Sequence, residues 1–168
     1  RVKPGDLIQV FLTTEPREIE IIPQNIPIDI VYEDDDVIVV NKPASMVVHP
    51  GYGNYTSTLL NALTYHFQQN EKSEVKPLLV HRIDKDTTGL LLVAKNEYAQ
   101  TFLAKQFFDH TTERKYTALV WGDLKEEEGT IEGNIGRSLK DRKVMAVFPE
   151  GDYGKTAITH WKVLKRFG

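Results

Sequence analysis

Short apolar segments separated by polar turns make up most of this chain, and helical spacing of apolar residues occurs in two places. Runs rich in valine, isoleucine and leucine, or alternating with polar residues, predict strands, because successive side chains of a strand point to opposite faces. Apolar residues that recur every three or four positions predict helices. The expected strands are 30–32, 37–40, 78–80, 90–93, 114–121, 129–135, 144–148 and 156–164, and the expected helices are 58–68 and 97–109.

The connections between these segments are short, which favours antiparallel neighbours. The acidic run Glu33–Asp36 separates two strand-like segments and predicts the turn of a β-hairpin. Thr56 or Ser57 is the expected N-cap of the first helix, and Asn96 precedes the second. Because strands outnumber helices, the predicted fold class is α+β, with a mostly antiparallel mixed sheet and flanking helices.

Composition limits the class of protein. The chain has 168 residues, 40% hydrophobic and 27% charged, which is typical of a soluble globular domain. No apolar run reaches the roughly 20 residues that cross a bilayer, so we expect a cytoplasmic protein without a membrane partner. The absence of cysteine excludes disulfides, thiolate metal sites and a cysteine nucleophile. A net charge of −3 means that a polyanionic partner would need a local basic patch.

The segment 81–89 contains the strongest candidate for chemistry, because it places charged residues on a loop between two buried strands. Its aspartates fit the start of a calcium loop, but the twelfth position of that pattern needs glutamate and here is Lys95. A divalent metal held by His81, Asp84 and Asp86 would be repelled by the cations between them. A third interpretation makes Asp84 a nucleophile or base acting on a sugar.

Two further features of this loop bear on that third interpretation. Arg82 offers a planar guanidinium that suits phosphate oxygens, so the loop has the charges expected for a phosphorylated sugar. Hydrolysis of a glycosidic bond would need a second carboxylate at a fixed distance. Asp86 is the nearest candidate for that carboxylate, but the turn residues around it do not favour the extended geometry that would align it with Asp84.

The stretch His81–Lys95 reads HRIDKDTTGLLLVAK and resembles the H-R-L-D-x-x-T-S-G-L-L-L-x-A-K signature of the RluA/RluD-type RNA pseudouridine synthases. Ile83 and Thr88 depart conservatively from it. Three other parts of the chain are also similar to motifs of this family. The first comprises residues 30–34, 39–44 and 47–50, the second residues 113–122, and the third residues 142–145 with 154–159.

The resemblance implies the pseudouridine synthase catalytic fold and isomerisation of uridine to pseudouridine in RNA, most often large-subunit (23S-type) ribosomal RNA, without metal or organic cofactor. It implies that Asp84 is the catalytic carboxylate and that Tyr116 stacks against the uracil. It implies that Arg82 contacts RNA and helps to hold the target nucleotide out of its stack. Lys42 and Lys155 are expected to add positive potential for RNA. The alternative is a non-catalytic RNA-binding or ribosome-assembly module on the same scaffold.

The resemblance also predicts a domain organisation. We expect residues 1–12 to be the tail of an upstream RNA-binding domain, 13–27 a proline-containing linker, and 28–168 the N-terminal part of the catalytic domain. The family's later T-G-R-T-H-Q-I-R segment has no counterpart in this sequence. We therefore expect a fragment of doubtful activity on its own, with an uncovered sheet edge that permits self-association.

Overall fold

The computed structural model describes residues 3, 5, 7, 20–70, 75–149, 151 and 153–167. The chain divides into two compact units, Arg1–Arg114 and Lys115–Gly168, and each is described by itself. The expected tail of an upstream RNA-binding domain, residues 1–12, falls almost wholly outside the described residues.

The first unit contains a four-stranded antiparallel sheet with the order β1-β2-β4-β3. Its strands are β1 (Asp29–Glu33), β2 (Val37–Lys42), β3 (Leu78–Leu79) and β4 (Gly89–Ala94). The predicted hairpin is confirmed, because β1 and β2 pair across the acidic turn. Asp34 stabilises that turn by accepting hydrogen bonds from the backbone N–H groups of Asp36 and Val37 at 2.9 and 2.7 Å.

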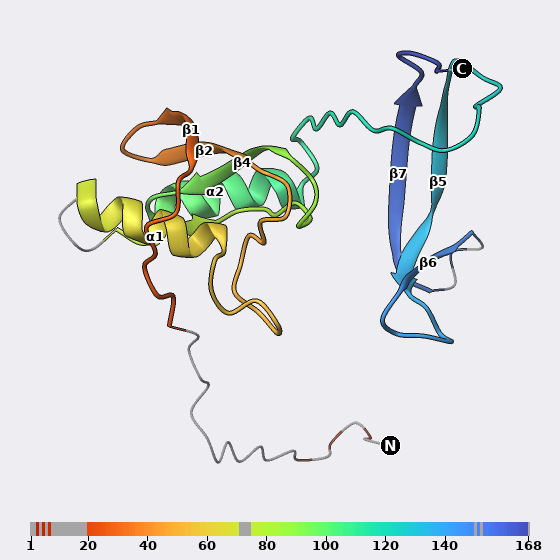
Figure 1. Cartoon of the computed structure of the whole chain (residues 1–168). Coiled ribbons are helices and arrows are strands. Elements are labelled where there is room, and N and C mark those ends of the chain that lie inside the picture. The colour runs from red at the N-terminus through yellow and green to blue at the C-terminus, as the bar shows by residue number, and fades with distance from the viewer. Residues whose placement is uncertain are drawn as a thin grey trace. The chain divides into compact units, whose positions relative to one another are not determined.

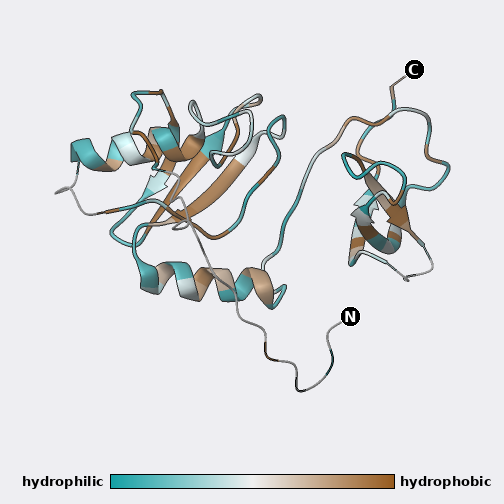
Figure 2. Ribbon diagram, turned by 90° about the horizontal axis from the view of Figure 1, so that it is seen from below, coloured by the Kyte–Doolittle hydropathy of each residue, from teal (hydrophilic) through white to brown (hydrophobic). Residues whose placement is uncertain are grey.

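Two helices, α1 (Leu59–Asn70) and α2 (Glu97–Phe108), cover opposite faces of this sheet (Figures 1 and 2). The main core lies on the α1 side, where apolar residues of the helix meet alternate residues of the two central strands. It contains the buried side chains of Ile38, Val40, Val48, Leu59, Leu63, Phe67, Ile83, Leu91 and Val93. Ile38 lies opposite Val93 and Val40 opposite Leu91, so the period of two places all four on one face.

The N-terminus of α1 differs from the prediction. Neither Thr56 nor Ser57 caps the helix; Thr58 does, since its carbonyl accepts the N–H of Ala62 and its side chain bonds to Asn61. The side-chain Oδ1 of Asn61 accepts hydrogen bonds from both the backbone N–H and the hydroxyl of Thr58, at 3.0 and 2.6 Å. Both side chains are buried. A cap one residue later allows this reciprocal pair to form away from water.

Asn61 also anchors part of the segment that the sequence predicts as a linker. Its Nδ2 donates to the carbonyl of Ile22 at 2.8 Å, and its own carbonyl accepts the N–H of Gln24 at 3.0 Å. Residues 20–27 thus run along the start of α1 without forming a helix or strand.

The second helix agrees with the prediction. Asn96 is its N-cap, with the side chain accepting the N–H of Ala99 at 2.9 Å, and Asp109 is the C-cap. Its exposed face includes the large side chains of Tyr98 and Phe102.

The second unit is a three-stranded antiparallel sheet with the order β6-β5-β7. Its strands are β5 (Glu128–Arg137), β6 (Met145–Phe148) and β7 (Lys155–Lys162), as the sequence predicts to within a few residues. The predicted strand 114–121 is wrong, because these residues form no strand in the structure. Their β-forming side chains are exposed, and no strand in the described part of the chain pairs with their backbone. A β-strand needs such a partner for its hydrogen bonds.

The fold class α+β is confirmed, and every strand pairing in the described residues is antiparallel. Edge strands are present in both sheets, and self-association through them stays a prediction. Among the residues that the structure describes, no helix is long and apolar enough to span a bilayer.

We predict that Asn61→Ala lowers the free energy of unfolding by about 1–3 kcal/mol, because it leaves buried polar groups of Thr58 and Ile22 without partners. Asn70→Ala is the matched control, since it removes an exposed asparagine from the last turn of the same helix. Urea denaturation should therefore rank Asn61→Ala as less stable than Asn70→Ala. Equal stability of Asn61→Ala and the parent would contradict this account of the helix N-terminus.

Candidate active site

Asp84 lies on the loop that connects β3 to β4, and a buried neighbour fixes this loop. Ile83 inserts into the main core, whereas Arg82 and Asp84 on either side are exposed. The N–H of Thr87 donates to the carbonyl of Asp84 at 3.2 Å, which closes a tight turn. The turn and the anchor together present the Asp84 carboxylate to solvent. Within the described residues, neither this carboxylate nor the Arg82 guanidinium has a hydrogen-bond or ion-pair partner.

The side chain of Lys42 holds this loop by hydrogen bonds from inside the protein. Its side chain is only 1% exposed, at the end of β2. The ammonium donates to three carbonyls, those of Pro43 at 2.8 Å, Met46 at 2.9 Å and Lys85 at 2.9 Å. A lysine ammonium has three N–H donors, so this set uses all of them. The bond to Lys85 ties the end of β2 to the turn next to Asp84.

Burial lowers the pKa of Lys42, and the carboxylates of Asp86 and Asp84 act in the opposite direction. The sequence predicts Lys42 as an RNA-binding cation, whereas the structure places its ammonium inside the protein. What the structure shows is a clamp on the loop. The part of Lys42 in RNA binding stays a prediction.

Gly89 ends the charged loop and begins β4. It lies opposite Lys42 in the sheet register and has a φ of +121°. Side chains with a Cβ rarely adopt this conformation. The glycine that ends the charged segment therefore has a backbone reason for its position.

His81 fixes the other end of the loop. Its Nε2 accepts a hydrogen bond from the N–H of Leu92 at 3.0 Å, and its ring stacks on Phe107 with centroids 4.5 Å apart. An accepting Nε2 requires the neutral ring. Burial lowers the pKa of His81, and the positive charge of Arg114 lowers it further. His81 thus has a structural role in this loop, as the acceptor of the Leu92 N–H and the stacking partner of Phe107.

The remaining predicted site residues belong to the second unit. Tyr116 is 64% exposed on the segment without regular structure, and Lys155 is exposed at the first position of β7. The structure brings Asp84, Arg82 and Lys42 together, and it describes Tyr116 and Lys155 in a different unit. Their roles stay predictions.

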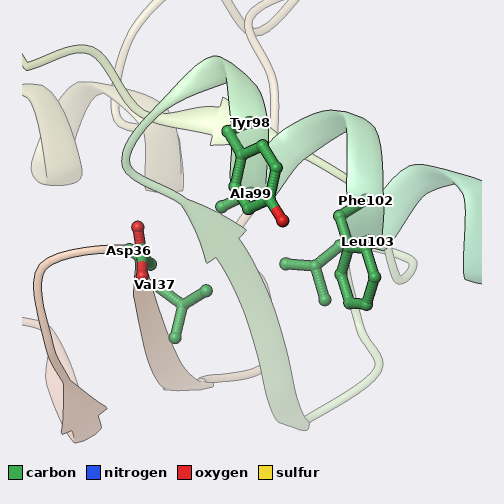
Figure 3. Close-up of a pocket in the computed structure, with 6 residues that line it drawn as sticks. All are labelled: Asp36, Val37, Tyr98, Ala99, Phe102 and Leu103. Atoms are coloured by element: carbon green, nitrogen blue, oxygen red, sulfur yellow. The ribbon is translucent and has the colours of Figure 1, made fainter.

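An open depression of about 300 Å³ lies elsewhere in the first unit, between α2 and the start of β2 (Figure 3). It is lined mainly by apolar groups of Val37, Tyr98, Ala99, Phe102 and Leu103, with Asp36 at its edge. Asp84 faces the opposite end of β2, next to Lys42. Within the described residues, no three histidine or acidic side chains gather as a metal site would need.

Comparison with known proteins identifies the family. A family model described as RNA pseudouridylate synthase matches residues 36–168 of the chain. The chain belongs to this family. The matched region includes both compact units from β2 onward, and with them the Asp84 loop, Tyr116 and Lys155.

Curated relatives agree with this assignment. The chain is 50% identical to the uncharacterized RNA pseudouridine synthase of Chlorobaculum parvum, over 100% of the chain and 53% of that protein. It is 46% identical to YlyB of Bacillus subtilis, also named an uncharacterized RNA pseudouridine synthase, over 99% of the chain and 54% of that protein. It is 46% identical to ribosomal large subunit pseudouridine synthase D of Zymomonas mobilis, over 89% of the chain and 47% of that protein. The chain thus spans about half the length of the curated relatives it matches.

Solved structures support the fold. Human RNA pseudouridylate synthase domain containing 1 matches with a TM-score of 0.64 and 26% identity, over 88% of this chain and 54% of that chain. Human RNA pseudouridylate synthase domain containing 4 matches with a TM-score of 0.65 and 21% identity, over 83% and 54%, which shows the shared fold alone.

We predict that Lys42→Met lowers the free energy of unfolding of the first unit by about 1–3 kcal/mol or more. Three carbonyls lose a buried charged donor in this variant. Lys85→Ala is the matched control, since it removes an exposed cation from the same turn and keeps the carbonyl that Lys42 binds. Thermal unfolding followed by circular dichroism measures both variants. Equal melting temperatures for the two would show that the clamp does not stabilise the loop.

We predict that His81 titrates below its ordinary pKa of about 6.5, as nuclear magnetic resonance can measure. Between the folded and unfolded pKa values the unfolded chain binds more protons, so the free energy of unfolding falls as pH decreases through this window and levels off below it. His81→Gln retains an acceptor for Leu92 and cannot titrate. Its unfolding free energy should depend less on pH between 7 and 5, and an unchanged dependence would contradict the assignment.

Proposed function

We propose that the protein isomerises uridine to pseudouridine in RNA, with Asp84 as the catalytic carboxylate. One observation carries this proposal: Asp84 is solvent-exposed and unpaired within the described residues, on a loop held by Ile83 and Lys42, in a chain that belongs to the RNA pseudouridylate synthase family. The carboxylate of a structural aspartate in a turn more often accepts hydrogen bonds from nearby backbone N–H groups, as that of Asp34 does.

The reaction suits the small set of groups at this loop. The bond between the uracil nitrogen and the ribose carbon breaks, the base turns over, and a bond from uracil carbon to the same ribose carbon forms. The nitrogen gains a proton and the carbon loses one, so the reaction is balanced without an added reactant. A carboxylate beside the ribose and base supplies a nucleophile or a base for these steps.

RNA binding in this proposal uses both units. Arg82, which is exposed two residues before Asp84, would contact a phosphate of the target nucleotide. Tyr116 would stack on the uracil once the base leaves its helix, and Lys155 would add positive potential. Extrusion of a nucleotide costs a few kcal/mol, and such contacts offset it.

Large-subunit ribosomal RNA is the proposed substrate. Relatives from Zymomonas mobilis and Haemophilus ducreyi that are 46% and 42% identical to the chain bear the name ribosomal large subunit pseudouridine synthase D. The same names support a place for the protein in ribosomal RNA modification, and we propose that it acts in the cytoplasm, where ribosomes assemble.

Asp84→Asn tests the proposal directly. In the full-length protein it should lower the rate of pseudouridine formation by about 10³-fold or more, because an amide can act neither as base nor as nucleophile. Release of tritium from uracil labelled at the carbon that joins the ribose measures each turnover. Affinity for the RNA should change little.

Asp86→Asn is the matched control, since it makes the same charge change two residues away on the same exposed turn. It should retain most of the activity. If Asp84→Asn lost RNA affinity and product formation to the same extent, a non-catalytic RNA-binding module would be the better description. Free uracil among the products would instead indicate hydrolysis of the glycosidic bond.

A further inference from the structure

The connection between β5 and β6, together with the ends of the strands beside it, concentrates positive charge in the second unit. Lys140, Arg142 and Lys143 lie in the connection, and Arg137 is the last residue of β5. All four are exposed. We call residues 137–144 the basic hairpin, which Figure 1 shows at one end of the second sheet.

Lys155 belongs to the same surface by register. Ile135 of β5 lies opposite Lys155 of β7, and Arg137 is two residues further along β5. Side chains two apart on a strand share a face, and diagonal neighbours across a strand pair have Cα atoms about 7–8 Å apart. Arg137 and Lys155 are therefore neighbours on one face of the sheet.

Hydrogen bonds within the basic hairpin hold its turn, and its one acidic side chain takes part in them. Asp141 accepts the backbone N–H of Lys143 through its Oδ1 at 2.9 Å. The hydroxyl of Ser138 accepts the N–H groups of Lys140 and Asp141 at 3.3 and 3.2 Å, and Arg137 donates to the carbonyl of Lys143 at 3.3 Å. These bonds fix the backbone and leave the lysine side chains in solvent.

Within the part of the chain that the structure describes, the side chains of Lys140, Arg142, Lys143 and Lys155 form no ion pair. Four of the eight acids in the sequence of the second unit lie around the start of β5. There Arg166 bonds to the carboxylates of Asp123 and Glu127.

The distance along β5 keeps those acids from neutralising the basic hairpin. A strand of 10 residues is about 33 Å long, and the Debye length at physiological salt is about 8 Å. Glu132 lies midway along the strand. Glu150 and Asp152, in the connection that follows β6, lie outside the described residues. With these acids counted, residues 137–155 contain five cations and three acids. This end of the second unit is therefore net positive in sequence despite the negative net charge of the chain.

We propose that the basic hairpin and Lys155 bind the phosphate backbone of the RNA substrate and determine its affinity, whereas the Asp84 loop performs the chemistry. This inference rests on the proposed function for its choice of RNA over an acidic protein surface. Contacts from exposed lysines and arginines to phosphates position a nucleic acid without reading its sequence. The hairpin would thus act as a general anchor and not as the determinant of which uridine reacts.

The test replaces Lys140, Arg142 and Lys143 by glutamine in the full-length protein. A matched control replaces Lys125, Lys162 and Lys165, three cations exposed at the other end of β5, and makes the same change in net charge. The probe is a transcript of large-subunit ribosomal RNA, with dissociation constants measured from 50 to 200 mM salt.

The hairpin variant should bind about tenfold more weakly at 0.1 M salt, and the slope of log affinity against log salt should become shallower by about 2, since each lost phosphate contact removes about 0.7–0.9. The control variant should stay within about twofold of the parent. At saturating RNA the hairpin variant should form pseudouridine at the parent's rate, and its circular dichroism spectrum should be unchanged.

Equal losses in the two variants would overturn the inference, because net charge alone would then explain them. So would unchanged RNA binding by the hairpin variant together with lost binding to polyglutamate, which would indicate an acidic protein partner. The proposed function fails separately: if Asp84→Asn remained active, the catalytic assignment would be wrong whatever the hairpin variant did. An inactive Asp84→Asn with normal salt dependence in the hairpin variant would reject the hairpin alone.

Discussion

The candidate site depends on the buried ammonium of Lys42. Removing a charge from water costs several kcal/mol, and the protein compensates this cost only if every donor of the ammonium finds an acceptor in good geometry. Here the three acceptors come from two loops that are far apart in the sequence. Two lie in the segment after β2, and one lies in the turn beside Asp84. Neither loop can shift far without leaving a buried charge unsatisfied, so the position of Asp84 follows from a residue 42 positions earlier.

Local patterns predicted the elements whose stability is mainly local. The hairpin of β1 and β2 and the helix capped by Asn96 agree with their sequence signals, because turn residues and capping side chains act within a few positions. The expected strand at 114–121 is the opposite case. Its side chains suit a strand, but strand formation depends on a partner strand, which a short-range pattern does not reveal. Among the residues that the structure describes, no strand pairs with it.

The site shows the same division. The charged loop, its glycine and the exposed Asp84 followed from the sequence, whereas the clamp did not. A signal for it existed: Ile38, Val40 and Lys42 alternate along β2, so Lys42 falls on the buried face. Period alone places the side chain, yet it does not say that three carbonyls from two loops would meet the ammonium there. Whether a lysine on the core face of a strand destabilises the fold or holds a loop depends on backbone carbonyls from distant parts of the sequence.

The positions of the charged residues say more about a polyanionic partner than the net charge of the chain does. The net charge of −3 would argue against a polyanionic partner if charges were evenly spread. In the second unit they are not, because acids gather around Arg166 while cations gather at the basic hairpin, several Debye lengths away along β5. Each unit thus has a separate physical task in the proposed reaction. A loop held by a buried ammonium needs rigidity to place one carboxylate, and an exposed basic turn needs only charge and solvent access to hold RNA.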